Sequence, residues 1–261
     1  MRLEFFGCGT SQGVPEILCD CKVCTSIDEN DKRLRSSIYV KHNDFNIVVD
    51  ITPDFREQCL RSKIPMVDAI FLTHLHADHF MGMDDIRKFN KIKDADIPLY
   101  LPHLMEDDFR AVFHYTLKEQ IPGLFRPRLS LNLIDEDPIM FGEMKVTPLK
   151  VLHGDSGEIR SYLFESDGKR IAYLTDCKVI PDKAMSLIKD CDIAILGALW
   201  DKDWDHSGHW NLQQAIEVAK EINAKQSYFT HITHLMGLHK EVNNKLPKHT
   251  QLAHDGLVIN L

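Results

Sequence analysis

The sequence THLHADH at residues 73–79 constrains the fold more than any other feature of this 261-residue chain. It places His74, His76, Asp78 and His79 in one turn, directly after the apolar run VDAIFL. His74 and His76 leave a predicted strand two residues apart, so their side chains lie on one face. One metal ion rarely takes four ligands from so short a segment, but two adjacent ions can each take two. The fold must then bring further ligands to this turn from distant segments.

Three other segments supply residues of the right kind. LKVLHGD places His153, IAYLTDC places Asp176 and SYFTHITH places His231, each at the end of an apolar, strand-like run. Residues that follow strands in separate parts of a chain can converge on one rim of a sheet. A single histidine in such a place is more often structural, but surface polarity does not explain the same layout in four segments. The pattern therefore predicts a metal centre.

The apolar pattern predicts strands and helices in alternation. Runs rich in β-branched and aromatic residues predict strands at 2–6, 36–41, 45–50, 68–72, 98–101, 129–134, 144–152, 160–166, 170–175, 192–197, 226–230 and 257–260. Apolar residues near a 3.6-residue period predict helices at 54–62, 82–92, 104–120, 182–190, 211–222 and 235–246. Strands with helices between and after them favour an α/β fold in which two packed sheets are covered by helices.

Composition indicates one domain over residues 1–261 and excludes several partners. With 44% hydrophobic residues, the chain can bury a substantial core. Its net charge of −8 disfavours long nucleic acids as partners. No apolar run approaches the roughly 18 residues of a membrane span, and the N-terminal MRLEFFGCGTS lacks the pattern of a signal peptide. We therefore expect a soluble, cytoplasmic protein that does not bind membranes.

A second cluster of metal-binding residue types lies near the N-terminus. Residues 8–26 contain a glycine-containing loop and a C-x-C-x-x-C cluster of Cys19, Cys21 and Cys24. Thiols in a cytoplasmic chain stay reduced, and three thiolates leave a tetrahedral zinc ion one ligand short. His234, which follows His231 in THITH, is our candidate for the fourth ligand of a structural zinc. The alternative is a reduced cysteine cluster at the surface.

The turn at 73–79 and the order of the later residues resemble the metallo-β-lactamase superfamily, whose hallmark turn is H-x-H-x-D-H. The resemblance runs from the first strand to the C-terminal HDGLVI, and it implies an αββα sandwich with the site on its upper edge. It also implies one ion held by His74, His76 and His153, a second held by Asp78, His79 and His231, and Asp176 bridging both. Histidine and aspartate ligands accept zinc, manganese or iron, so the sequence leaves these two metals open.

Within the superfamily, GTSQGVP, C-x-C-x-x-C and THITH together resemble the PhnP-like branch of phosphoribosyl cyclic phosphate phosphodiesterases. This resemblance implies hydrolysis of a small cyclic or nucleotide-like phosphodiester by a metal-bridging hydroxide. A histidine general acid would then protonate the leaving oxygen. We assign this role to His209, which precedes a helix that Asn211 can cap, with His206 as the rival. We also expect Asp78, together with His209, to be a catalytic residue.

Two carboxylates are candidates for hydrogen bonds to the free nitrogen of a ligating histidine. Asp50 ends the predicted strand at 45–50, and we expect it to face the same rim as the metal ligands. Asp255 in AHDGL is a weaker candidate, because Asp-Gly is also an ordinary hairpin turn.

Residues 102–128 have the pattern of a helical insertion next to the site. If this segment is a substrate lid, its residues Phe109, Phe113, Tyr115, Phe125 and Arg126 or Arg128 contact the substrate. An amphipathic helix packed on the core is the simpler interpretation.

Two other function classes fit the same ligands. A hydrolase of carboxylic ester, lactone or thioester bonds needs no general acid at His209. A non-hydrolytic accessory protein of cofactor biosynthesis retains metal without turning over any ester. The complete ligand set and the available acid favour the phosphodiesterase. The cysteine loop, if fixed by zinc, can also contribute to a homodimer surface.

Overall fold

The computed structural model describes residues 1–119, 121, 123 and 125–261, which form two sheets of seven strands each. In spatial order, the strands of the first sheet are β14 (Val258–Asn260), β1 (Arg2–Gly7), β2 (Ser37–His42), β3 (Phe45–Val49), β4 (Ala69–Phe71), β5 (Ile97–Pro102) and β6 (Leu129–Ile134). Those of the second sheet are β13 (Thr250–Leu252), β12 (Gln226–Thr230), β11 (Ile193–Gly197), β10 (Lys169–Leu174), β9 (Glu158–Ser166), β8 (Met144–Leu152) and β7 (Ile139–Phe141).

Each sheet is antiparallel in one half and parallel in the other. In the first sheet, β14 to β3 pair antiparallel and β3 to β6 pair parallel. In the second, β13 to β10 pair parallel and β10 to β7 pair antiparallel. Strands β8, β10 and β12 therefore run in the same direction and end at the same edge, where polar loops can meet.

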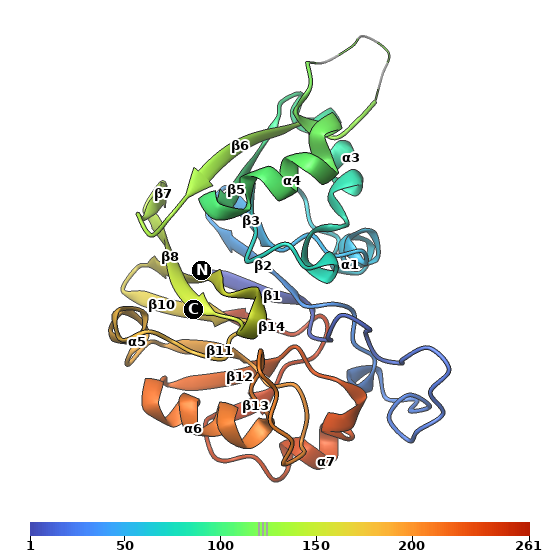
Figure 1. Cartoon of the computed structure of the whole chain (residues 1–261), viewed down its shortest axis with the longest axis vertical. Coiled ribbons are helices and arrows are strands. Elements are labelled where there is room, and N and C mark those ends of the chain that lie inside the picture. The colour runs from blue at the N-terminus through green and yellow to red at the C-terminus, as the bar shows by residue number, and fades with distance from the viewer. Residues whose placement is uncertain (120, 122, 124) are drawn as a thin grey trace.

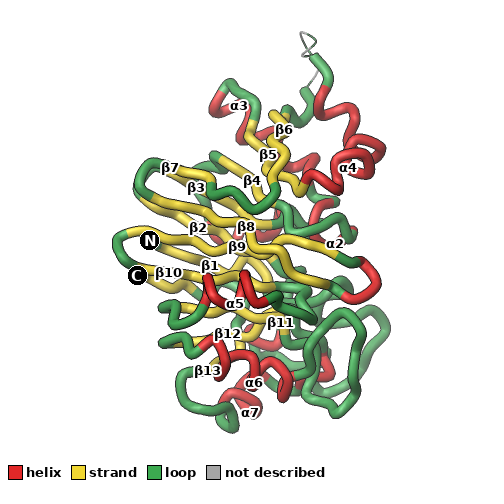
Figure 2. The backbone as a smooth tube through the Cα atoms, turned by 60° about the vertical axis from the view of Figure 1, so that its left-hand side comes forward, coloured by secondary structure: helices red, strands yellow, loops and turns green. Residues whose placement is uncertain are grey.

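Alternating side chains build one core between the sheets and another beneath the helices. Ile47 and Val49 of β3 belong to the apolar cluster that also contains Ile171 and Tyr173 of β10. The intervening Val48 belongs to the cluster that includes residues of the covering helices. Both faces of the sheets are buried in this way, which explains why their strands are rich in Val, Ile and Phe. The predicted αββα sandwich is confirmed (Figures 1 and 2).

Helices cover the outer faces of the two sheets. They are α1 (Phe55–Ser62), α2 (Ala77–Phe80), α3 (Arg87–Lys93), α4 (Glu106–Phe113), α5 (Asp182–Ile188), α6 (Leu212–Ile222) and α7 (His239–Asn243). Helix α1 packs against β1, α5 against β8 and α6 against β11. The chain ends lie together (Figure 1), because β14 pairs with β1 and the Met1 amine donates to the Leu261 carbonyl oxygen at 2.9 Å.

The amphipathic helix α6 shows how sequence pattern fixes local structure beside the site. Its buried residues follow the 3.6-residue period and are Leu212, Ala215, Ile216, Ala219 and Ile222. The predicted cap is confirmed, because the Asn211 side chain accepts from the Gln214 N–H while the Gln214 side chain accepts from the Asn211 N–H. The loop that precedes this helix is therefore held at a defined position.

Several predicted elements differ from the structure. Strands β7 and β13 were not predicted, because three-residue strands are too short to show an alternating pattern. The helix predicted at 235–246 is wrong: a 3₁₀ turn and α7 are separated by Gly237, whose φ of +100° no helix accommodates. The helix predicted at 82–92 is divided into a 3₁₀ turn at Met83–Ile86 and α3. Residues 77–80, predicted as a turn, form the single helical turn α2.

The segment 102–128 contains less helix than predicted. A 3₁₀ turn at His103–Met105 leads into the eight-residue α4, and a second 3₁₀ turn covers His114–Leu117. Residue 120, the predicted end of this helix, lies outside the described residues. Phe109 and Phe113 are buried in the core, as the simpler interpretation requires, while Phe125, Arg126 and Arg128 line a separate cavity together with α3 residues.

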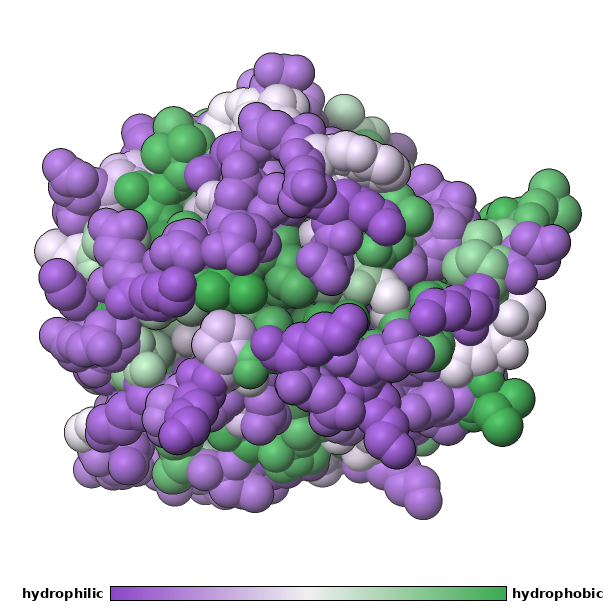
Figure 3. Space-filling model, turned by 90° about the horizontal axis from the view of Figure 1, so that it is seen from below, coloured by the Kyte–Doolittle hydropathy of each residue, from purple (hydrophilic) through white to green (hydrophobic). Residues whose placement is uncertain are grey.

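The cysteine-rich loop projects from the sandwich, on the right of Figures 1 and 3. Hydrophobic residues stand out on this projection in Figure 3, and Ile17, Leu18 and Ile27 are 87%, 100% and 95% exposed. In the part of the chain that the structure describes, no helix is long and apolar enough to cross a membrane.

Asp255, in the turn before β14, binds the backbone of Cys8 and Leu34 on either side of the cysteine cluster, and its predicted contact with a ligating histidine is wrong. Its carboxylate accepts hydrogen bonds from the Cys8 N–H at 3.0 Å and the Leu34 N–H at 2.9 Å, and it pairs with Arg61 at 3.0 Å. The short turn after β13 directs it toward this backbone instead of toward the metal-ligand histidines.

We expect Asp255→Ala to lower the free energy of unfolding by about 3 kcal/mol, because two backbone donors lose their acceptor and Arg61 loses its partner. Urea denaturation monitored by circular dichroism measures the change. As a control, Asp203→Ala removes an exposed carboxylate and should stay within about 0.5 kcal/mol of wild type. Equal stability of the two variants would contradict the assignment.

Candidate metal centre

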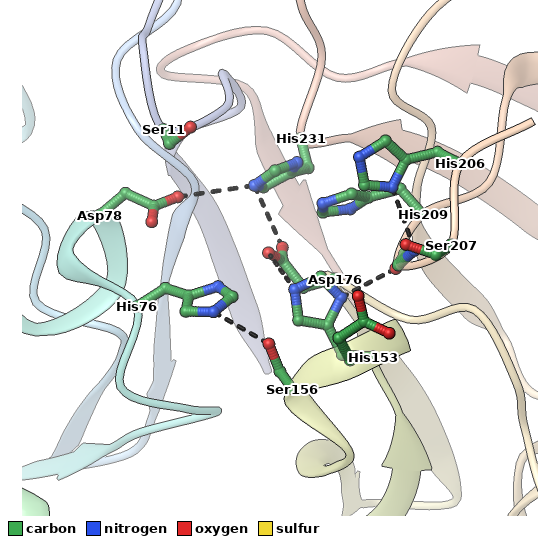
Figure 4. A pocket seen from close by; sticks show the side chains of 12 residues that line it. Ser11, His76, Asp78, His153, Ser156, Asp176, His206, Ser207, His209 and His231 are labelled. Atoms are coloured by element: carbon green, nitrogen blue, oxygen red, sulfur yellow. Dashed lines mark hydrogen bonds and ion pairs between the residues drawn. The ribbon is translucent and has the colours of Figure 1, made fainter. Parts of the chain in front are cut away.

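The residues predicted as metal ligands meet at one edge of the sandwich. His74 and His76 follow β4, and Asp78 and His79 lie in α2. His153 follows β8, Asp176 lies two residues beyond β10, and His231 follows β12 directly. Figure 4 shows the side chains of His76, Asp78, His153, Asp176 and His231 around one cavity.

Two groups of ligand atoms form in this region, and they match the two sets that the family resemblance implies. His74, His76, His153 and Asp176 each place a nitrogen or oxygen within 4.8 Å of the others. Asp78, His79 and His231 form the second group by the same measure.

The Asp176 carboxylate lies between the two groups. Its Oδ2 is 3.7 Å from His74 Nε2 and 3.4 Å from His79 Nε2, and its Oδ1 is 3.2 Å from His231 Nε2. Burial alone would raise the pKa of Asp176, but the surrounding imidazoles, His231 and His79 first, hold it well below its usual value. The carboxylate is therefore ionised and faces both groups.

Buried histidine nitrogens that have no hydrogen-bond partner test whether metal ions fit between the two groups. Among the described residues, the buried Nε2 atoms of His74, His79 and His231 have no hydrogen-bond partner. A buried nitrogen left without a partner costs about 1–3 kcal/mol. A divalent cation would satisfy these lone pairs and the carboxylates at once, so the donor set fits the expected metal ions.

Hydrogen bonds on the far nitrogens decide which ring atoms face the centre. Asp50 Oδ2 lies 2.7 Å from His79 Nδ1, and the Gly208 carbonyl oxygen lies 2.8 Å from His153 Nδ1. Both oxygens accept, so each Nδ1 carries the proton and each Nε2 keeps a lone pair for a metal. The structure thus places Asp50 where the sequence led us to expect it.

Thr73 and Ser156 hold the other two imidazoles, and sequence reasoning missed both residues. The Thr73 hydroxyl donates to Asp50 at 2.9 Å and lies 3.0 Å from His74 Nδ1, whose proton it can accept. Ser156 Oγ lies 3.0 Å from His76 Nε2, which leaves Nδ1 of His76 for a metal. Thr73 lies directly beside His74, but nothing in the pattern around Ser156 indicates a contact with a residue 80 positions away.

The backbone at the site is strained, and the surrounding contacts maintain the strain. Asp50, Asp176 and His231 have φ angles of +67°, +50° and +55°, in the left-handed region that costs non-glycine residues about 1–2 kcal/mol each. Gly208 avoids a different conflict: a Cβ atom there would lie 2.8 Å from His153 Cε1. A close approach of this backbone to the His153 ring therefore requires glycine.

His209 lies against the metal-ligand histidines, and His206 lies one step further out. The His209 ring stacks on that of His231 at 4.9 Å and is 4.7 Å from that of His153. It also offers a ligand atom within 4.8 Å of Asp176 and His231. His206 packs on His209 at 4.9 Å and accepts a hydrogen bond from the Gly208 N–H. His209 is therefore the better placed of the two histidines.

The loop that carries His209 is held from both sides. Lys178 Nζ donates to the His209 carbonyl oxygen at 3.2 Å and to Gln214 Oε1 at 3.2 Å, and Trp210 Nε1 donates to the Lys178 carbonyl oxygen at 3.0 Å. Burial, and then the neighbouring His231, lowers the pKa of His209 to about 3, so its imidazole is neutral at pH 7 in the free protein.

The cavity over the centre has a volume of about 240 Å³ and a polar lining. Its lining residues are Ser11, His76, Asp78, His153, Asp155, Ser156, Asp176, His206, Ser207, Gly208, His209 and His231. This surface suits a small, charged and hydrogen-bonding ligand.

Cys19, Cys21 and Cys24 of the projecting loop form a separate four-residue group with His234. Cys19, Cys21 and Cys24 place their Sγ atoms 3.1, 3.5 and 3.5 Å from His234 Nδ1. A tetrahedral zinc with the usual bond lengths sets sulfur and nitrogen about 3.6 Å apart, so the spacing fits that ion. The other imidazole nitrogen lies 3.1 Å from Glu16 Oε2, which fixes the ring.

A family model described as a β-lactamase superfamily domain matches residues 45–232 of the chain. This match covers more than half of the 261 residues, so the chain belongs to the superfamily, and its two-sheet sandwich is the metallo-β-lactamase fold. The family predicted from the turn at 73–79 is confirmed.

One solved structure supports the PhnP-like branch. The crystal structure of a diphosphatase from the PhnP family aligns with a TM-score of 0.89 and 40% identity, over 100% of this chain and 97% of that one. An octanoyltransferase of Porphyromonas gingivalis is 34% identical over 260 residues, which are 98% of this chain and 51% of the relative, so the chain spans about half the length of that protein. Zinc-bound PqqB from Methylobacterium extorquens has the same fold, with a TM-score of 0.79 and 19% identity over the full length of both chains.

We expect Asp50→Ala to weaken metal binding at the His and Asp centre by about 10- to 100-fold, because His79 loses the carboxylate that orients its ring. Competition with a chromophoric chelator measures the affinity. Asp192→Asn provides a matched control, since Asp192 is a buried carboxylate that pairs with Lys225 far from the centre. Unchanged affinity in a folded Asp50→Ala protein would contradict the role given to Asp50.

We expect Cys24→Ser to lose about one zinc per chain and to expose the loop to proteases, because a hydroxyl is a poor zinc ligand at this thiolate-rich site. Elemental analysis and limited proteolysis check both effects. Cys59→Ser is the control, because Cys59 lies in α1 outside both ligand groups. Full zinc content in Cys24→Ser would rule out the four-ligand site.

Proposed function

We propose that the protein is a metal-dependent phosphodiesterase that hydrolyses small cyclic or nucleotide-like phosphodiesters. The observation that carries this proposal is the position of His209 at the wall of one cavity, beside two groups of ligand residues that have the Asp176 carboxylate between them. A phosphodiester needs positive charge around the phosphoryl oxygens and a proton for the oxygen that leaves, and this cavity offers a place for both.

The proposed centre holds one cation at His74, His76 and His153, a second at Asp78, His79 and His231, and uses Asp176 for both. When bound, such cations supply Lewis acidity and an ionised water molecule near neutral pH. The chain itself supplies orientation: Asp50, Thr73, Ser156 and the Gly208 carbonyl each hold one imidazole by its far nitrogen. This fixed geometry reduces reorganisation during the reaction.

His209 takes the role of general acid in this proposal. Burial and the neighbouring His231 lower its pKa in the metal-free site, and the negative charge of a bound phosphate acts in the opposite direction. A protonated imidazole beside the phosphate can give its proton to the leaving oxygen. Lys178 and the cap of α6 keep the ring at the cavity wall.

A diphosphate is the second candidate substrate, because the PhnP-family structure that is 40% identical to this chain is described as a diphosphatase. The chemistry is closely related, since attack at phosphorus expels an oxygen in both reactions. A phosphate leaving group needs less help from an acid than an alkoxide does, so dependence on His209 distinguishes the two substrates.

Acyl transfer is a weaker candidate. The octanoyltransferase relative is about twice as long as the aligned segment, so its name describes a protein of which half lies outside the match. No aliphatic side chain is among the residues that line the main cavity, so an eight-carbon chain would find little to pack on there. An accessory role without turnover would not explain why His209 is held at a fixed position beside the ligand groups.

We expect His209→Ala to lower kcat for 2′,3′-cyclic nucleotides by about 10²- to 10⁴-fold, and to lower kcat for bis(p-nitrophenyl) phosphate much less, because p-nitrophenolate leaves without a proton. Metal content should remain at the wild-type level. Steady-state kinetics and elemental analysis on the same preparations measure both quantities.

His206→Ala and Asp176→Ala complete this experiment. The first should retain the wild-type ratio between the two substrates, and the second should lose turnover of both. Equal losses on both substrates in His209→Ala would contradict the acid role, and metal-loaded wild type without turnover of any diester would contradict the proposed function. Turnover of a nucleotide diphosphate sugar in place of both diesters would favour the diphosphatase.

A further inference from the structure

His231 differs from the other metal-facing histidines because no hydrogen bond orients its ring. Four of the five histidines in the two ligand groups contact a protein oxygen through the nitrogen that faces away from the centre. Among the described residues, His231 Nδ1 is buried without such a partner, while its Nε2 faces Asp78 and Asp176 (Figure 4). The ring packs on His209 and His79, but these contacts supply no hydrogen bond. The position of His231 must therefore come from its backbone.

The backbone of His231 belongs to a segment that also carries one member of the cysteine cluster. His231 follows β12 with a φ of +55°, and His234 begins a 3₁₀ turn that ends at Met236. Two residues separate the histidine of the metal centre from the histidine that faces the three cysteines. Because consecutive Cα atoms are held about 3.8 Å apart, a displacement of this turn also displaces His231.

The Arg33 side chain holds this 3₁₀ turn from inside the protein. It is 0% exposed, and its guanidinium donates to the Thr233 carbonyl oxygen at 2.9 Å and to the Gly237 carbonyl oxygen at 3.4 Å. These two carbonyl groups lie on either side of the turn. A guanidinium is planar and presents its donors in a rigid fork, so it can hold two acceptors at a set separation.

The backbone around Arg33 connects the same turn to the loop that carries the cysteines. The Arg33 N–H donates to the Val14 carbonyl oxygen at 2.7 Å, and its carbonyl oxygen accepts from the Val14 N–H at 2.9 Å. The Asp31 carboxylate accepts from the Ser26 hydroxyl at 2.7 Å and from the His239 N–H at 2.7 Å. These contacts join the cysteine loop to the segment between β12 and α7, which lies beside it in Figure 1.

Stability alone does not explain a buried guanidinium at this place. Its partner Asp31 is 2% exposed but lies 3.7 Å away, and the Nε of Arg33 has no hydrogen-bond partner among the described residues. An ion pair taken out of water gains little net stability, and apolar side chains of similar volume often serve as well. The contribution of Arg33 is therefore the fixed relative position of the segments that it contacts.

We propose that Arg33 is a positioning residue that couples the two metal sites, so that zinc at the cysteine cluster raises the affinity of the second ligand group for its ion. Zinc fixes His234, and Arg33 holds the turn so that the backbone of His231 stays in place. The first ligand group depends less on this turn, because each of its three imidazoles has its own hydrogen bond. The coupling is reciprocal, so metal at the centre also strengthens zinc binding at the cluster. It requires metal at both sites and is independent of the reaction at the centre.

Two substitutions of Arg33 test the proposal in the Zn²⁺-loaded protein. Arg33→Met fills a similar volume without donors and should lower the affinity of the second ligand group for Zn²⁺ about tenfold. Arg33→Lys keeps the charge but cannot fork to both carbonyl groups, so the loss should be about threefold. Competition with a chromophoric chelator resolves the successive dissociation steps, and elemental analysis counts the ions that remain.

Two reference variants assign the dissociation steps. His231→Ala removes a ligand of the second group, and His76→Ala removes one of the first. The titration of Arg33→Met should resemble that of His231→Ala and differ from that of His76→Ala. Co²⁺ in place of Zn²⁺ reports the cysteine cluster separately, because thiolate ligands give Co²⁺ a charge-transfer absorption that nitrogen and oxygen ligands do not.

Arg160→Met is the matched control. The Arg160 side chain is also buried, at 3% exposed, but it donates to the Asp135 carbonyl oxygen and pairs with Glu158, both outside the segment after β12. This variant should be less stable in urea without selective loss of one ion. Equal loss of both ions in Arg33→Met, or the same selective loss in Arg160→Met, would reduce the effect to general destabilisation and overturn the proposal.

Cys24→Ser tests the coupling from the other direction. Removing zinc from the cysteine cluster should also weaken the second ligand group about tenfold, and the double variant with Arg33→Met should lose little more, because both changes act through one turn. Wild-type affinity at the centre of a Cys24→Ser protein that has lost its zinc, or additive losses in the double variant, would overturn the proposal. Should Arg33→Met not fold, Arg33→Lys and Cys24→Ser decide by the same criteria.

Discussion

The structure depends on one electrostatic constraint, which is the burial of the Asp176 carboxylate among four metal-facing histidines. Its oxygens lie 3.2–3.8 Å from the Nε2 atoms of His74, His79, His153 and His231. A buried carboxylate and a set of unpaired imidazole nitrogens are costly, unless positive charge satisfies all of them. The sandwich makes this arrangement possible because β8, β10 and β12 run in the same direction and end at one edge. The strand order that buries the apolar strands therefore also brings the ligand-carrying loops together at one edge.

The ligating imidazoles are oriented by hydrogen bonds to residues that surround the centre. Each of His74, His76, His79 and His153 is held through its far nitrogen, by Thr73, Ser156, Asp50 and the Gly208 carbonyl respectively. These partners come from different segments, so the position of one ring depends on the packing of several loops. Asp50, Asp176 and His231 adopt left-handed backbone angles, a cost that the surrounding sheet compensates. The centre is thus preorganised before any ligand binds, which is what electrostatic stabilisation of a phosphoryl group requires.

The sequence predicted the architecture and the residues at the centre, because strand-end ligands leave a local signal that spacing makes visible. It predicted twelve of the strands and helices α1, α5 and α6 within a few residues, and the Asn211 cap followed from one polar side chain before an apolar period. The missing elements are those that tertiary contacts create: β7 and β13 are three residues long and exist only through their neighbours. Ser156 and Gly208 contact histidines 80 and 55 residues away. Asp255 accepts from the Cys8 N–H, 247 residues away. No local pattern could place these three residues correctly.

Substrate choice on this fold must come from the parts that differ from the common centre, because the ligand set alone fits phosphodiesters, diphosphates and acyl esters. The loop at 206–209 supplies such a difference here. It holds the His209 ring against the rings of His231 and His153 at the cavity wall, where Lys178 and the cap of α6 keep it in place. A substrate whose leaving oxygen needs a proton gains from an imidazole at this position, whereas a substrate with a good leaving group does not.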